Sequence, residues 1–197
     1  WSIPATQTTA RNGQWQPGPG DALLDAMRSA TGKLAIVAED LGVITEAVDA
    51  LRLRHNIPGM KVLQFAVDDP GFSLASITEQ SVCYTATHDN DTTVGWFNGG
   101  PDDTRTGEQL RQTRENALRI SGGTAQTIHH DMIRLAFESQ ARLAIAPMQD
   151  FLGSDSSSRL NIPGTTMNNW RWRLQNGQLK PGLRAIIAAM VESSSRA

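Results

Sequence analysis

Residues 81–91 read Ser-Val-Cys-Tyr-Thr-Ala-Thr-His-Asp-Asn-Asp, an apolar run that ends in a cluster of ionisable and amide side chains. The run Ser81–Thr87 lacks the strict alternation of apolar and polar residues that marks a half-exposed strand. Short apolar runs of this kind are typical of parallel strands that are buried on both faces. The stretch therefore predicts a buried strand whose carboxyl end carries the polar cluster His88–Asp91.

Three further runs have the same character, and each also leads to acidic or amide residues. The runs are Leu34–Ala38, Lys61–Ala66 and Arg142–Ala146, and the residues that follow them are Glu39-Asp40, Asp68-Asp69 and Gln149-Asp150. The carboxyl ends of parallel strands meet at one edge of a sheet, which is the edge that carries the active site in a βα barrel. We therefore expect one polar site built from several strand ends.

Helical patterns alternate with these runs. The predicted helices are Asp21–Ala30, Thr45–His55, Thr106–Ile120, Thr127–Ser139 and Pro181–Ser193. Strands that alternate with helices indicate an α/β fold with a parallel sheet, and four such units correspond to half of a (β/α)8 barrel. A half-barrel leaves strand edges uncovered, so it needs a partner or the other half. Because the chain starts in a polar loop without a signal sequence, we interpret residues 1–197 as one half-barrel of a longer catalytic domain.

Composition excludes several classes of protein. The chain has 18 Lys and Arg against 20 Asp and Glu, a net charge of −2, which argues against a duplex-binding module with a basic face. Its longest apolar runs fall far below the ~20 residues of a membrane span. A lone Cys83, expected to be a small core residue, cannot form an internal disulfide. The sequence thus predicts a cytoplasmic protein with neither nucleic acid nor membrane as partner.

The chemistry that suits these residues is sugar chemistry. Glycoside cleavage needs two carboxyl groups, and indole faces such as those of Trp96, Trp170 and Trp172, expected in loops, offer flat apolar surfaces to pyranose rings. Phosphate chemistry is less favoured because the sequence has no Gly-rich lysine loop. Adjacent helical residues point about 100° apart, so His129-His130-Asp131 does not suit a joint metal site. We expect no metal and no organic cofactor.

Residues 38–45, Ala-Glu-Asp-Leu-Gly-Val-Ile-Thr, resemble a signature of the 4-α-glucanotransferases of glycoside hydrolase family 77, the amylomaltases or disproportionating enzymes. The similarity continues in chain order through residues 58–66, 84–93, 147–150, 159–165 and 169–174, with residues 13–15 and 18–20 similar to the loop before the acid/base strand. It implies an α-1,4-glucan or malto-oligosaccharide substrate and the C-terminal half of a (β/α)8 barrel.

The resemblance also implies roles for individual residues. Glu39 matches the general acid/base that protonates the glycosidic oxygen, and Asp89 matches the carboxylate that stabilises the transition state. Other positions match residues that contact the glucan or neighbour the acid, namely His88, Asp40, Phe65, Asp69 and Asn161.

The sequence departs from the family at two places. The aspartate nucleophile of the family's double displacement lies in an Arg-x-Asp-His segment, which residues 1–197 do not contain. In addition, Ala75–Thr78 differs from the family's Pro-His-Asn-Tyr stretch. Two interpretations follow: a half-barrel that is catalytic when the missing half is supplied, or an inactive fragment that self-associates or only binds glucan. An α-glucan hydrolase with the same carboxylates is a neighbouring alternative.

Overall fold

The computed structural model describes residues 1–196, and the chain divides into two compact units, Trp1–Pro58 and Gly59–Ala197. Among the described residues, none of the helices has the length and apolar character that crossing a bilayer requires.

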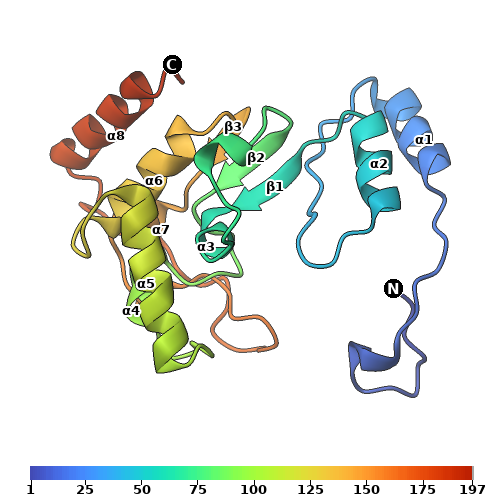
Figure 1. Ribbon diagram of the computed structural model, residues 1–197, viewed down its shortest axis with the longest axis horizontal. Helices are drawn as coiled ribbons and strands as arrows, with labels where there is room; N and C mark the ends of the chain where they lie inside the picture. Colours follow the sequence, from blue (N-terminus) through green and yellow to red (C-terminus); the bar gives the residue numbers. More distant parts are fainter. Residues whose placement is uncertain (197) are drawn as a thin grey trace. The chain divides into compact units, whose positions relative to one another are not determined.

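The second unit is built on a three-stranded parallel sheet. Its strands are β1 (Gly59–Val62), β2 (Ser81–Tyr84) and β3 (Leu143–Ile145), in the order β1-β2-β3 (Figure 1). Gly59 pairs with Ser81, and Val82 pairs with Leu143. The parallel arrangement confirms the α/β class that the alternating pattern predicts. Each of these strands lies within or overlaps one of the predicted runs, but all are shorter.

The run Lys61–Ala66 is only partly a strand. β1 ends at Val62, and the next residues form a one-turn helix, α3 (Leu63–Ala66), in which Val67 N–H donates to Leu63 O. Leu63 is fully buried in this helical conformation. A short apolar run buries its side chains equally well in either form, so periodicity alone does not separate the two.

The helices of the second unit agree with the predictions where their patterns are long. The longer ones are α5 (Gly107–Ser121), α6 (Ile128–Glu138) and α8 (Pro181–Ser193), and the shorter ones are α4 (Thr93–Asn98), α7 (Met148–Phe151) and the 3-10 turns Leu74–Ser76 and Ser156–Ser158. The prediction of a loop at Trp96 is wrong, because Trp96 lies in α4, half-buried beneath the guanidinium of Arg105 at 5.5 Å from the ring centre.

The contiguous hydrophobic core cluster lies entirely in the second unit. Helix α6 supplies one side of it through Ile128, Met132, Ile133 and Ala136, all at most 1% exposed. The sheet contributes Cys83, which is fully buried as predicted, and burial raises the pKa of its thiol to about 11. The core therefore fixes β2 against α6.

The first unit contains a 3-10 turn (Ala10–Asn12) and two helices, α1 (Asp21–Thr31) and α2 (Glu46–Arg54). The predicted strand Leu34–Ala38 is wrong: this segment is irregular, so the described chain has three parallel strands rather than four. Its side chains alternate between half-buried and exposed, as in a strand. However, the backbone hydrogen bond found for the segment runs from Ala38 N–H to Pro58 O, and a strand needs a ladder of such bonds.

Candidate active site

The carboxyl end of β2 leads into a tight turn that presents two ionisable side chains. Asn90 Oδ1 accepts hydrogen bonds from the N–H and the Oγ1 of Thr87, at 2.9 and 2.8 Å. Thr87 Oγ1 in turn accepts from Asp89 N–H at 3.3 Å. This local network satisfies the turn's polar groups without using the side chains of His88 and Asp89, which are about half exposed.

Asp89 is fixed from a distant part of the chain. Its Oδ1 accepts a hydrogen bond from Asn161 Nδ2 at 2.6 Å and lies 3.3 Å from His88 Nε2. Its backbone oxygen accepts from Arg159 Nη2 at 2.8 Å, and Arg159 Nε also donates to Asn161 O. Within residues 1–196, Oδ2 of Asp89 has no protein donor. One carboxylate oxygen is therefore held, and the other is open to a ligand.

An indole lies against the imidazole that neighbours this carboxylate. The ring of Trp170 is 5.1 Å from the imidazole of His88, with 38° between the planes, and Trp170 is 53% exposed. Trp170 N–H donates to Leu160 O at 2.7 Å, and its backbone has a positive φ of 62°. The exposed indole beside His88 is a flat apolar surface of the kind that pyranose rings stack on.

Asp150 anchors both ends of the turn. Its carboxylate, at 0% exposure, accepts hydrogen bonds from Thr85 Oγ1 at the end of β2 and from Thr93 N–H and Oγ1 at the start of α4. The turn lies between these two threonines. Burial raises the pKa of Asp150, and its three hydrogen bonds oppose that effect. The sequence places Asp150 at a strand end, but its role in the structure is to hold the turn.

A second acidic residue of the cluster also faces the interior. Asp91 Oδ2 accepts a hydrogen bond from Ser156 Oγ at 2.5 Å, and Asp91 O accepts from Gln64 Nε2. Two glycines border this pair: a Cβ on Gly95 or Gly100 would lie 2.3 or 2.4 Å from Ser156 Oγ. The packing therefore requires glycine there.

The residues after β1 also include one acid that is engaged in the fold and others that are exposed. Asp68 accepts hydrogen bonds from Thr113 Oγ1 and Asn116 Nδ2 on α5, so it ties the loop to that helix. Asp69 is exposed and accepts from Gly71 N–H at 2.8 Å. Phe65, on α3, is 56% exposed. The sequence assigns Phe65 and Asp69 to the cleft, and these two residues remain available to a ligand.

Glu39 and Asp40 belong to the first unit. The Glu39 side chain is exposed and has no protein partner among the described residues. Asp40 Oδ2 lies 3.4 Å from Arg52 Nε, and both side chains are about 15% exposed. Arg52 also donates to Ile57 O, so this ion pair attaches the segment that carries Glu39 to the end of α2.

Sequence reasoning missed two residues of the site, Arg159 and Ser156. It also missed that Asp150 anchors the turn. Arg159 stands two residues before Asn161 in a quoted motif, which is a signal that the two act together. Ser156 lies in a Ser-rich stretch without a distinguishing pattern. No group of ligands that could hold a metal occurs among residues 1–196.

This geometry defines an α/β protein with a polar site at the carboxyl edge of a parallel sheet, where a held carboxylate adjoins an imidazole and an exposed indole. A family model described as 4-alpha-glucanotransferase, glycoside hydrolase family 77, matches residues 1–180. The chain belongs to this family, as its motifs predict.

Individual relatives agree with the family model. The 4-alpha-glucanotransferase of Synechocystis sp. is 43% identical over 202 residues, covering 100% of this chain and 38% of the relative. That of Thermus thermophilus is 40% identical over 203 residues, covering 100% of this chain and 40% of the relative. Among solved structures, the amylomaltase from Streptococcus agalactiae in complex with acarbose superposes with a TM-score of 0.84 at 30% identity, covering 98% of this chain and 38% of that one. The chain thus spans about two fifths of the length of these relatives.

Proposed function

We propose that this chain carries the general acid/base and the transition-state stabiliser of a 4-α-glucanotransferase, which transfers α-1,4-glucan segments between malto-oligosaccharides. The observation that carries the proposal is the state of Asp89: Asn161 and Arg159 hold it in place, His88 and Trp170 flank it, and one carboxylate oxygen is open. A fixed carboxylate beside a flat apolar surface is suited to the positive charge that develops on a sugar ring.

The proposed reaction is a retaining double displacement. Glu39 donates its proton to the glycosidic oxygen while an aspartate attacks the anomeric carbon, and the glycosidic bond breaks. Glu39 then takes a proton from the acceptor hydroxyl, whose oxygen displaces the aspartate. Asp89 contacts the ring hydroxyls and stabilises the oxocarbenium-like centre in both steps. Because residues 1–197 lack an Arg-x-Asp-His segment, the nucleophile comes from another part of the enzyme.

We further propose that this chain forms the C-terminal half of a (β/α)8 barrel, completed by an N-terminal half that carries the nucleophile. The three parallel strands in chain order and the 38% coverage of the solved amylomaltase are consistent with this arrangement. The acarbose complex of that amylomaltase supports a glucan-like substrate here. Trp170 and Phe65 supply the exposed aromatic faces, and His88, Asp69 and Asn161 supply polar contacts.

A chimera tests the proposal. The chain replaces the matched region of the Thermus thermophilus relative, and the purified chimera is incubated with maltotriose. We expect oligosaccharides both longer and shorter than the substrate, whereas a hydrolase would only release reducing ends. Glu39→Gln should abolish transfer, because an amide cannot donate the proton. A matched control is Glu79→Gln, since Glu79 is also exposed. Near-normal turnover by the Glu39→Gln chimera would end the assignment.

One observation favours a second function for the isolated chain, which is association or glucan binding without catalysis. Strand β3 has one neighbour, β2, and exposes Leu143 and Ile145 by 55% and 43%. Exposed apolar edges promote pairing with another chain. Light scattering on the isolated chain, with and without acarbose, tests this alternative. A monomer that does not bind acarbose would contradict it.

A further inference from the structure

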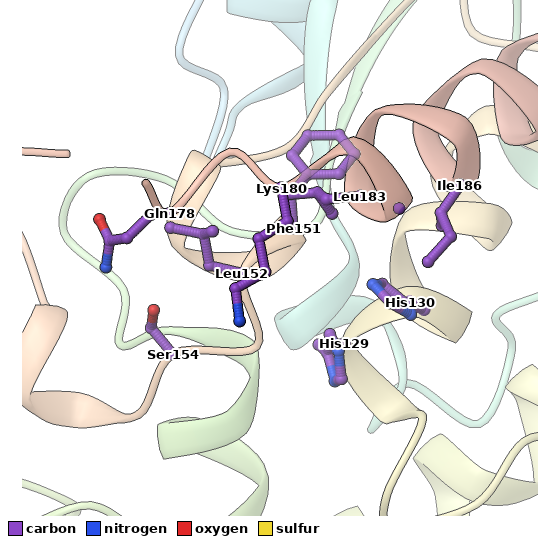
Figure 2. Close-up of a pocket in the computed structure, with 10 residues that line it drawn as sticks. His129, His130, Phe151, Leu152, Ser154, Gln178, Lys180, Leu183 and Ile186 are labelled. Carbon is purple, nitrogen blue, oxygen red and sulfur yellow. The ribbon is translucent and has the colours of Figure 1, made fainter. Parts of the chain in front are cut away.

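A second site lies among α6, α7 and the beginning of α8, formed by residues to which neither the proposed reaction nor the family resemblance assigns a role. It is an open cavity of about 420 Å³ (Figure 2). Phe151, Leu183 and Ile186 provide its apolar surface, and His129, His130 and Lys180 are the ionisable residues that line it. A volume of this size lies in the range of about 300–1,000 Å³ that small-molecule sites occupy.

The charge of this cavity has one sign. All its ionisable lining residues are bases, and none of the carboxylates in the described part of the chain lines it. The acid nearest in sequence to the two histidines, Asp131, has other partners: its Oδ2 accepts from Thr127 Oγ1 at 2.6 Å, and its Oδ1 lies 3.6 Å from Arg134 Nη2. The basic groups therefore have no counter-ion within the lining of the cavity, although the charge of Asp131 acts on His129 from outside it.

The two histidines are close together, although adjacent helical positions ordinarily diverge. Their ring centres are 4.2 Å apart, and both rings line the cavity. His130 Nε2 is buried and has no hydrogen-bond partner within residues 1–196. Burial, and then the neighbouring His130, lower the pKa of His129, and the charge of Asp131 partly opposes them. A buried nitrogen without a partner costs free energy, which a bound acceptor would recover.

The beginning of α8 adds to this preference for negative charge. Lys180 is the N-cap residue, Pro181 follows at the first helical position, and the first turn contains no acidic residue. No side chain caps the helix, so its N-terminal N–H groups keep their partial positive charge. Figure 2 shows the Lys180 side chain extending from this helix end toward the level of Ser154 and His129.

We propose that this cavity binds a small organic anion, whose carboxylate or phosphate contacts Lys180 and the two imidazoles while its body lies on Phe151 and Leu183. The apolar surface selects against a bare inorganic anion, and the Lys180 ammonium selects against a neutral molecule of the same shape. A carboxylate or phosphate on an apolar or sugar-like body shares this chemistry. The site does not depend on the glucan-transfer proposal.

Imidazole proton resonances of the chain provide the test, because it has only four histidines. The probes are benzoate and glucose 1-phosphate, each beside a neutral counterpart, benzamide or glucose, with inorganic phosphate as a fifth. We expect saturable shifts of His129 and His130 with at least one charged organic probe, and much weaker effects with its neutral counterpart. The responding probe identifies the ligand as a carboxylate or a sugar phosphate. Resonances of His55, outside the cavity, should not move.

Variants separate binding at this cavity from a general charge effect. Lys180→Met retains most of the side-chain stem and should weaken binding about tenfold or more, because it removes a charged partner. Lys33→Met removes an exposed lysine of the first unit and should leave the affinity unchanged. The proposal is overturned if neither charged probe gives a saturable shift, if a neutral counterpart binds as tightly, if inorganic phosphate binds as tightly as the organic probes, or if Lys180→Met binds normally.

Discussion

At the scale of single residues, the acidic groups after the strands divide into two kinds. Asp89 is half exposed, its carboxylate accepts one hydrogen bond, from Asn161, and its other oxygen stays available. Asp150 is fully buried, and both of its carboxylate oxygens accept hydrogen bonds from threonines. The sequence predicts that acids gather at the strand ends. It does not tell which are available for chemistry, because that depends on partners that lie 57 to 72 positions away in the chain.

Removing the buried carboxylate of Asp150 should lower the stability of the fold. Asp150→Ala leaves the hydroxyls of Thr85 and Thr93 and the Thr93 N–H without their buried acceptor. Since each unsatisfied buried group costs about 1–3 kcal/mol, we expect the free energy of unfolding to fall by about 3 kcal/mol in urea denaturation. Asp102→Ala, at an exposed acid, is the control. Equal stability of the two variants would contradict the anchoring role.

His129 should make the stability of the chain sensitive to mild acid. Burial and His130 lower its pKa below the ordinary 6.5, so the unfolded chain binds this proton more readily than the folded chain. The contribution of His129 to stability is therefore present above pH 6.5 and is lost as the pH falls through its folded pKa. Urea denaturation over this range should show a smaller pH dependence for His129→Gln than for the parent chain. An unchanged pH dependence in the variant would contradict the burial of this imidazole.

At the scale of elements, prediction succeeded where a helix carries its own end signals. Thr106 caps α5 through a capping box with Gln109, and Pro181 starts α8 at the predicted residue. Prediction failed where pairing with another part of the chain decides the structure. Leu34–Ala38 has the composition of a strand but lacks a ladder, and α3 has the composition of a strand but closes a helical turn. Local composition does not encode these pairings.

The short helix α4 depends on a glycine. An added Cβ on Gly95 would lie 2.3 Å from Ser156 Oγ and 2.6 Å from Asp91 Cγ. Gly95→Ala should therefore reduce the free energy of unfolding by about 1–3 kcal/mol, since well-packed sites tolerate no added methyl group. Gly107→Ala is the matched control, because its Cβ would meet nothing within 4 Å. Thermal or urea denaturation distinguishes them. A loss of similar size at Gly107 would show that the close approach at Gly95 is not the cause.

At the scale of the whole molecule, the two units differ in how they are stabilised. The buried core cluster lies in Gly59–Ala197, whereas Ile57 is the one buried hydrophobic residue of the described first unit. Exposed ion pairs such as Arg54 Nη2 with Asp21 Oδ2 at 3.1 Å join α2 and α1 instead. Surface contacts of this kind contribute little stability.

Hydrogen exchange should reveal this difference. We expect backbone amides of α6 and β2 to exchange slowest, and those of α1 and α2 at least about a hundredfold faster, because local opening is easiest where few apolar groups are buried. Mass spectrometry after proteolysis resolves these segments. A chain that starts at Gly59 should keep the protection of α6. Equal protection in both units would contradict the account of where the stability resides.

The candidate site could be predicted from the sequence only in part. The motifs name Glu39, Asp89 and Asn161, and the structure brings Asp89, His88 and Asn161 into contact within the second unit. The roles of these residues remain predictions. Trp170 was expected in a loop beside a sugar, and its contact with His88 depends on a positive φ that no sequence pattern signals. Motifs thus name the participants, whereas long-range hydrogen bonds decide their geometry.

The most direct test of the central claim is maltotriose disproportionation by the chimera with Asp89→Asn, beside the chimera with Asp102→Asn. Asp102 is an exposed acid without a role in the site. If Asp89 stabilises the transition state, its amide variant should lose at least about a hundredfold in transfer rate, as removal of one stabilising group does in other enzymes. The Asp102→Asn chimera should match the parent. Transfer by Asp89→Asn at the parental rate, with an intact fold, would contradict the claim.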